Sequence, residues 1–177
     1  ARNEDKLFSL ARELRSQCPV EISKKPAQAA CKAHIVITVT SAITTIIDAQ
    51  SLKAGSIVCD ASYPANIAYE IHGKRHDVLV FEGGIVAWEG LRNQVDRNNA
   101  LWHFNPSAGV HGCFAETLLL ALEKKFVTYS IGRGYITFEK MEEMDQLASK
   151  YNFHPAQFWQ GTKVYNKYFF CLDIKLT

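Results

Sequence analysis

The first hydrophobic positions of the chain recur at the three- and four-residue spacing of an α-helix. Residues 3–17 predict a helix that Asn3 caps, with an apolar stripe formed by Leu7, Leu10, Ala11 and Leu14. A short strand is predicted at residues 20–22. A brief helix follows at 26–33, with Pro26 in its first turn, where the missing N–H costs nothing.

Three short apolar runs follow, at residues 34–40, 55–62 and 77–84. Their β-branched content and their lengths favour buried strands over helices. The spacers are long enough for crossover connections, and the first, residues 45–55, has a helix-like pattern that ends at Gly55. Alternation of this kind predicts an α/β fold with a parallel sheet.

The pattern changes near residue 105, where helical spacing returns. Helices are predicted at residues 113–126 and 138–151, the second with Thr137 as its N-cap. We therefore expect two regions: residues 1–104, which form the C-terminal part of a Rossmann-like domain, and residues 105–177, a helical C-terminal region that carries Cys113. Residues 159–177 are aromatic and mildly strand-like, and the pattern assigns them to no element.

Composition narrows the class of protein. A chain of 177 residues that is 47% hydrophobic and carries a net charge of +2 has the core of a globular protein and no electrostatic footprint for nucleic acid. No segment is apolar enough to cross a membrane. The five cysteines are widely spaced without a CxxC pair, which indicates neither a disulfide framework nor a zinc site and favours a reducing, cytoplasmic location. The chain begins without Met or a signal peptide, so we expect a piece of something longer.

Candidate ligand-binding residues lie at the carboxyl ends of the predicted strands, where open parallel sheets bind ligands. Thr40 and Ser41 offer hydroxyl groups, and Gly83 and Gly84 allow a close backbone approach. Ordinary strand-ending turns explain the same residues equally well. Arg2 stands just before the first helix, where a dinucleotide-binding fold can place the ligand of a 2′-phosphate. The alternative is an exposed terminal arginine.

Cys113 is the candidate nucleophile. The entrance of a helix stabilises a thiolate, Gly112 leaves room for an acyl group, and His111 could supply charge or move a proton. Glu116, one turn later, would oppose the thiolate unless it turns away. A cysteine before an apolar helix is more often packed in a core. The HxxxH spacing of His72 and His76 indicates a solvated loop, and we predict no metal site.

Five segments in this order carry a resemblance to a known family. The sequence resembles the C-terminal half of the long-chain acyl-[acyl-carrier-protein] reductases of cyanobacteria and their bacterial relatives, from Ala1 to about Pro155. The segments are AHIVITVTSA, SIVCDASYPANIA, VLVFEGGIV, GCFAETLLLALE and SIGRGYITFEKMEEMDQLASKYNFHP. The CFAE helix entrance and the GRGYITFEKME run are the parts specific to that group, whereas the strands fit many dehydrogenases.

The resemblance implies an NADPH-dependent reduction of a fatty acyl thioester to a fatty aldehyde, a reaction of lipid metabolism. It implies that Cys113 accepts the acyl group from acyl carrier protein, and that Arg2 binds the 2′-phosphate of NADPH. Thr40, Ser41, Gly83 and Gly84 fall on what resemble the cofactor-facing loops of the family.

Departures from the family keep other functions open. The first βα unit, its glycine-rich phosphate loop and the substrate domain are missing, so we expect the chain alone to bind NADPH weakly. The turn at residues 60–66 also replaces a more glycine-rich one. Two alternatives remain: another NAD(P)-dependent dehydrogenase of the shikimate or amino-acid type, and a truncated, non-catalytic module that oligomerises through an exposed sheet edge. The sequence leaves a homo-oligomer open.

Overall fold

The computed structural model describes residues 3–67, 75–88, 109–131, 135–160 and 163–164. The chain divides into two compact units, one formed by Ala1–Val80 and one by Phe81–Asp173, and each is described by itself. The predicted boundary after residue 104 lies outside the described residues, so that division of the chain stays a prediction.

The first unit begins with the two predicted helices, α1 (Glu4–Leu14) and α2 (Pro26–Ala30). The side chain of Asn3 accepts a hydrogen bond from the backbone N of Lys6 at 2.9 Å, which confirms the predicted N-cap. Pro26 is the first residue of α2, as predicted. The strand predicted at residues 20–22 is wrong. This segment is irregular because it pairs with no described strand, and three residues form no strand on their own.

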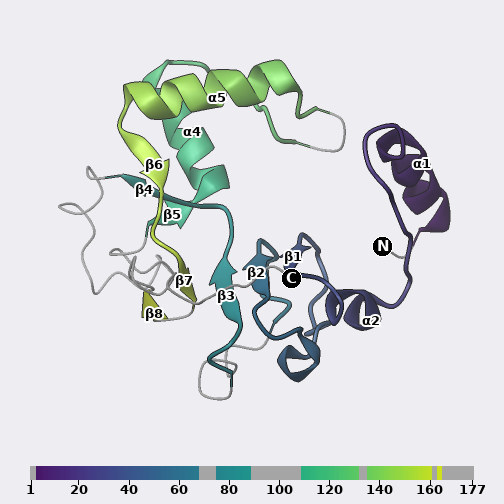
Figure 1. The fold of residues 1–177 in the computed structure, drawn as a ribbon. Coiled ribbons are helices and arrows are strands. Elements are labelled where there is room, and N and C mark those ends of the chain that lie inside the picture. The colour runs from purple at the N-terminus through teal and green to yellow at the C-terminus, as the bar shows by residue number, and fades with distance from the viewer. Residues whose placement is uncertain (1–2, 68–74, 89–108, 132–134, 161–162, 165–177) are drawn as a thin grey trace. The chain divides into compact units, whose positions relative to one another are not determined.

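The three predicted strands are confirmed as β1 (Ile35–Thr38), β2 (Ile57–Asp60) and β3 (Leu79–Glu82), which lie side by side in that order (Figure 1). β1 and β2 pair in parallel. The backbone N of Leu79 donates to the carbonyl of Ser56 at 3.0 Å, which joins β3 to β2. The chain therefore has an α/β fold with a partial Rossmann-like arrangement, as the apolar runs predict.

One face of this sheet carries the core of the first unit. The core consists of buried aliphatic side chains from the strands and their connections: Ala30, Val36, Ile47, Leu52, Val58, Ile67, Val78 and Val80. The opposite face of β1 is open, because Ile35 and Ile37 are 66% and 67% exposed among the described residues. The sheet thus has one covered face and one exposed apolar strip.

The prediction of a crossover helix at residues 45–55 is wrong. Only a 3₁₀ turn, η1 (Ala49–Ser51), forms there. Ile47 makes a parallel bridge to Ile67 and is therefore extended, and the Asp48 carboxylate accepts from the backbone N of Gln50 at 2.9 Å. These contacts favour a turn over a continuous helix. Gly55 ends the segment with φ at +76°.

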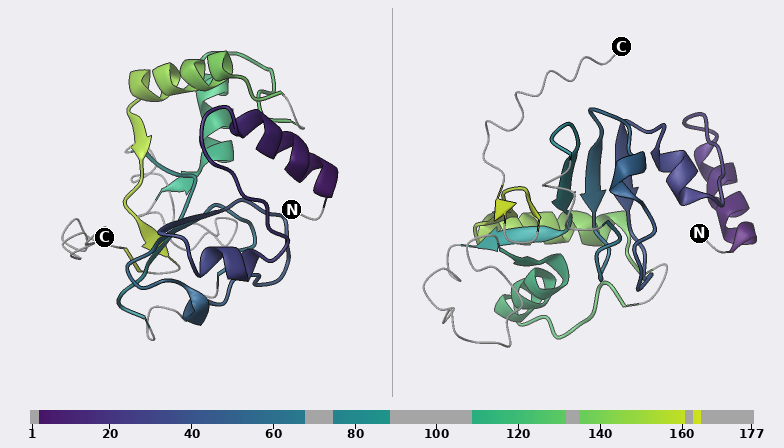
Figure 2. Two further views of the ribbon diagram at one scale, coloured as in Figure 1. Left: turned by 45° about the vertical axis from the view of Figure 1, so that its right-hand side comes forward. Right: turned by 90° about the horizontal axis from the view of Figure 1, so that it is seen from below.

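The second unit contains both predicted helices, α4 (Gly112–Leu122) and α5 (Phe138–Lys150), which contact each other and appear together in both views of Figure 2. It also contains an antiparallel sheet that the sequence did not predict, with β4 (Ile85–Trp88) between β5 (Val110–His111) and β6 (Phe153–Pro155). A separate pair consists of β7 (Trp159–Gln160) and β8 (Lys163–Val164).

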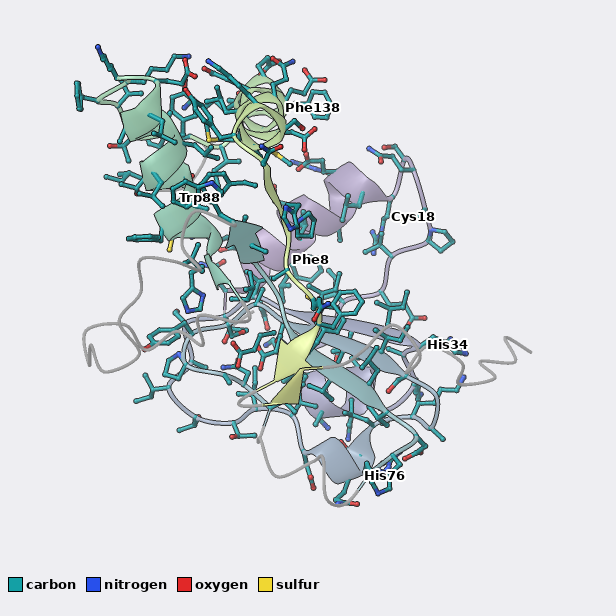
Figure 3. All side chains as sticks on the ribbon, turned by 90° about the vertical axis from the view of Figure 1, so that its left-hand side faces the viewer. Phe8, Cys18, His34, His76, Trp88 and Phe138 are labelled. Atoms are coloured by element: carbon teal, nitrogen blue, oxygen red, sulfur yellow. The ribbon has the colours of Figure 1, made fainter. Side chains whose placement is uncertain are left out.

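The helices and the antiparallel sheet share one core. Buried Val110, Ala115, Leu119, Leu147 and Phe153 form its centre. The ring of Trp88, labelled in Figure 3, stacks on that of Phe153 with centroids 4.9 Å apart, which fixes β4 against β6. Across the described residues, no helix is long and apolar enough to cross a membrane.

Candidate active site

The carboxyl ends of β1 and β2 meet at a buried carboxylate. Asp60 is only 4% exposed, and its two oxygens accept four hydrogen bonds. The Thr38 hydroxyl donates at 2.6 Å, and the backbone N–H groups of Ser62, Asn66 and Ile67 donate at 3.1, 2.7 and 3.1 Å. Because each oxygen has two donors, Asp60 is satisfied within the protein and holds the 60–67 turn in place.

Thr40 takes part in the same network. Its hydroxyl donates to the Asn66 side-chain oxygen at 2.5 Å and accepts from the backbone N of Ala42 at 3.0 Å. Its own backbone N donates to the Ser62 hydroxyl at 3.0 Å. Thr40 therefore holds the loop in its conformation, and only one lone pair of its hydroxyl oxygen is left to accept a hydrogen bond from a ligand. Ser41, by contrast, is exposed in the loop that follows β1.

Asn66 is a polar residue of this loop that sequence reasoning missed. It is completely buried, and its side-chain nitrogen donates to the carbonyls of Ala42 and Pro64 at 3.2 and 3.1 Å. These bonds tie the loop after β1 to the loop after β2. An amide six residues after a strand-ending aspartate is the sequence signal that could have pointed to it.

The turn at Gly83 and Gly84 lies against the entrance of α4. Gly84 has φ at +72°, and its carbonyl accepts from the backbone N of Gly112 at 2.7 Å. No atom lies within 4 Å of a Cβ built on Gly84, so this turn is open to close approach. The structure thus brings a glycine predicted to face the cofactor next to the residue that precedes Cys113.

Cys113 is the second residue of α4, and its free thiol is exposed. Packing in a core, the commoner role for such a cysteine, is therefore not its role here. His111 occupies the N-cap position, where its side chain makes no capping hydrogen bond. The Glu116 carboxylate accepts from the Ser130 hydroxyl at 2.9 Å, so it is engaged with the loop after α4.

A second cysteine shows the opposite environment. Cys59 lies on β2 and is partly buried, and burial together with the neighbouring Asp60 charge raises the pKa of its thiol. Such a cysteine stays protonated and reacts slowly.

The other predicted site residues are placed as follows. Arg2 and His72 lie outside the described residues. In the parts of the chain that the structure describes, no group of three His, Cys, Asp or Glu side chains could hold a metal ion. The exposed Ser41 lies in the first unit, and the open Gly84 turn lies in the second.

Comparison with known proteins finds distant relatives. No family model matches the chain. The chain is 29% identical over 163 residues to the long-chain acyl-[acyl-carrier-protein] reductase of Synechococcus elongatus, covering 88% of this chain and 44% of that protein. It is distantly related to a reductase.

A second relative has a different name. The aminotransferase PigE of a Serratia species is 28% identical over 153 residues, covering 86% of this chain and 17% of that protein. The chain thus spans less than half the length of either of these relatives. Neither of these two similarities assigns a chemical role to a single residue of this chain.

Proposed function

We propose that the chain carries the acyl-accepting part of an NADPH-dependent reductase that converts a long-chain fatty acyl thioester of acyl carrier protein to a fatty aldehyde. The single observation that supports this most is the exposed Cys113 thiol in the first turn of α4, within a chain related to an acyl-[acyl-carrier-protein] reductase. The free thiols of the described cysteines agree with a reducing cytoplasm.

Cys113 performs the first step in this proposal. Its thiolate attacks the thioester carbonyl of the acyl carrier protein, a new thioester forms on Sγ, and the phosphopantetheine thiolate leaves and takes up a proton. Cys113 lies in the first turn of α4, where the positive end of the helix dipole stabilises a negative charge. His111, directly before the helix, is the proposed proton carrier.

Bound NADPH would supply the hydride that reduces this thioester to the aldehyde and frees the Cys113 thiolate. Ser41 and the lone pair left on Thr40 are proposed to contact its ribose or phosphate groups. Gly83 and Gly84 are proposed to let NADPH approach the protein backbone closely, because they have no side chains. Arg2 is proposed to bind the 2′-phosphate of NADPH.

Aldehyde formation tests this proposal. The protein at its natural length is incubated with hexadecanoyl-acyl carrier protein and NADPH, and hexadecanal is measured by gas chromatography. Cys113→Ser should abolish the aldehyde, whereas Cys18→Ser, at the other exposed described cysteine, should leave its rate unchanged. Undiminished aldehyde from the Cys113 variant would show that Cys113 is not the acyl acceptor. No aldehyde from the unaltered protein would instead support a dehydrogenase that needs no thiol, such as one acting on a hydroxy or amino acid.

A non-catalytic module is the second candidate, and one observation favours it. β1 is an edge strand of the described sheet, and its Ile35 and Ile37 side chains are about two-thirds exposed. Open edges and apolar strips of this kind pair with further chains. Light scattering and an NADPH titration separate the candidates, because a stable oligomer that binds no cofactor supports the module.

A further inference from the structure

The second unit contains an apolar pocket between α4 and α5. Its volume is about 410 Å³, within the range of roughly 300–1,000 Å³ typical of small-molecule sites. Apolar side chains from both helices and from β6 line its body: Ala115, Leu119, Met141, Met144, Ala148 and Phe153. Gly112, the residue before Cys113, forms one end.

The pocket has the composition of a site for a flexible apolar ligand. Both methionines of the chain, Met141 and Met144, line it, and unbranched thioether side chains adapt their shape to different apolar partners. Met141 and Ile136 line the pocket and are nevertheless 57% and 58% exposed. Apolar walls that remain in contact with water gain stability when an apolar ligand covers them.

The charges of the lining favour a neutral ligand. Glu116, Asp145 and Lys140 contribute two negative charges and one positive charge. The Lys140 ammonium already donates to the carbonyl of Tyr135 at 2.6 Å and lies 5.4 Å from the ring centroid of Tyr129. A free fatty acid would bring a third negative charge, whereas the tail of a thioester brings none.

Two polar clasps hold the walls of the pocket together. Glu123, at the end of α4, accepts from the Lys150 ammonium and from the Tyr151 hydroxyl at 2.8 Å. On α5, Glu143 accepts from the Lys125 ammonium and from the Tyr129 hydroxyl, as a second clasp. These hydrogen bonds lower the pKa of both carboxyls, Lys150 having the larger effect on Glu123.

We propose that the pocket between α4 and α5 binds the hydrocarbon tail of the acyl group while its carbonyl is attached to Cys113. The proposal rests on the proposed function and adds the residues that select chain length. Residues 112, 115, 116 and 119 form the pocket-facing stripe of α4, and Cys113 stands beside this stripe. A long tail that starts at Sγ reaches the pocket along the first turn of α4, because positions 113 and 116 are neighbours on the helix surface and Glu116 lines the pocket.

Binding is measured without chemistry. S-hexadecyl-pantetheine and S-octyl-pantetheine, thioethers that cannot transfer their chains, are titrated calorimetrically into Cys113→Ala. Each methylene buried in the pocket strengthens binding about fourfold, so the hexadecyl compound binds much more tightly. Ala148→Phe fills the pocket and should weaken hexadecyl binding at least about tenfold, with less effect on the octyl compound.

Two further variants control for folding and position. Gln146→Phe places the same ring on an exposed position of α5 that does not line the pocket, and it should change neither affinity. Met141→Ala removes a side chain that is 57% exposed, so it should fold, and it should weaken hexadecyl binding several-fold. Equal affinities in Ala148→Phe and Gln146→Phe, or an unchanged affinity in Met141→Ala, would overturn the proposal.

The outcomes also separate this inference from the proposed function. If Ala148→Phe abolishes hexadecyl binding but Cys113 accepts no acyl group, the pocket is supported and the acyl-transfer role is refuted. If Cys113 is acylated at the same rate by octanoyl and hexadecanoyl donors, the acyl-transfer role is supported and the proposed role of the pocket is refuted. Self-association that the Ala148→Phe variant prevents would assign the groove to a second copy of the chain and overturn the inference.

Discussion

Replacement of Asp60 by alanine should be among the most damaging single changes in the first unit. The carboxylate is 4% exposed and accepts from one hydroxyl and three backbone N–H groups, all in the loops that follow β1 and β2. Removing it leaves three buried donors and one partly buried donor, the N–H of Ser62, without their acceptor. At about 1 kcal/mol for each donor, the low end of the usual range, the free energy of unfolding falls by about 4 kcal/mol.

Asp60→Asn should cost much less. If the new amide NH₂ faces Thr38, the Thr38 hydroxyl can rotate and accept from it, and the amide oxygen keeps the bonds from Asn66 and Ile67. Only the N–H of Ser62 then loses its acceptor. The expected loss is about 1–2 kcal/mol.

Urea denaturation followed by circular dichroism measures both losses. Asp48→Ala is the matched control, because the Asp48 carboxylate is exposed and accepts one backbone bond, from Gln50. It should cost only about 0.5 kcal/mol. Equal losses for Asp60→Ala and Asp48→Ala, or an Asp60→Ala loss below about 1 kcal/mol, would show that the buried network does not hold this sheet edge together.

Three further predictions concern the second unit and the cysteines. Iodoacetamide should modify Cys113 faster than Cys59, whose thiol is partly buried and has a raised pKa, and peptide mass spectrometry that finds equal rates would contradict this. Gly109→Ala should destabilise more than Gly84→Ala in thermal unfolding, since a Cβ at Gly109 would lie 2.4 Å from a backbone carbonyl oxygen and one at Gly84 would meet nothing; equal costs near 1–2 kcal/mol would count against it. The pKa of Glu143 is lowered, first by its ammonium partner, so its stabilising effect is present above the ordinary glutamate pKa and is lost as pH falls through the lowered value. Glu143→Gln should therefore flatten the acid limb of the stability curve at low salt, and an unchanged limb would refute this.

The parallel sheet could be predicted because its strands are rich in β-branched residues and bury one face, and both properties leave a pattern in the sequence. The four residues of β2, for example, have alternating burial with Val58 fully enclosed. The helix expected at residues 45–55 failed for a reason that no local pattern reveals. Ile47 pairs with Ile67, twenty positions away, and this tertiary contact overrides the helical spacing.

The antiparallel sheet of the second unit could not be predicted for a similar reason. β5 has two residues and β6 three, so neither is long enough to show a period of two. At the candidate site, sequence identified Cys113 and the Gly84 turn separately. Their proximity depends on the pairing of β4 with β5, which sets Gly84 against Gly112. Asn66 was missed because asparagine is common in exposed turns, and its spacing from Asp60 does not by itself indicate burial.

Identifying the acylated residue tests the proposed role of Cys113 most directly. The 177-residue chain is incubated with hexadecanoyl-acyl carrier protein, digested, and the hexadecanoyl thioester is located by peptide mass spectrometry. We expect a single hydroxylamine-sensitive adduct on Cys113, which is absent from Cys113→Ala and unchanged in Cys59→Ala. A chain that takes up no acyl group, or an adduct that persists on another cysteine of Cys113→Ala, would contradict it.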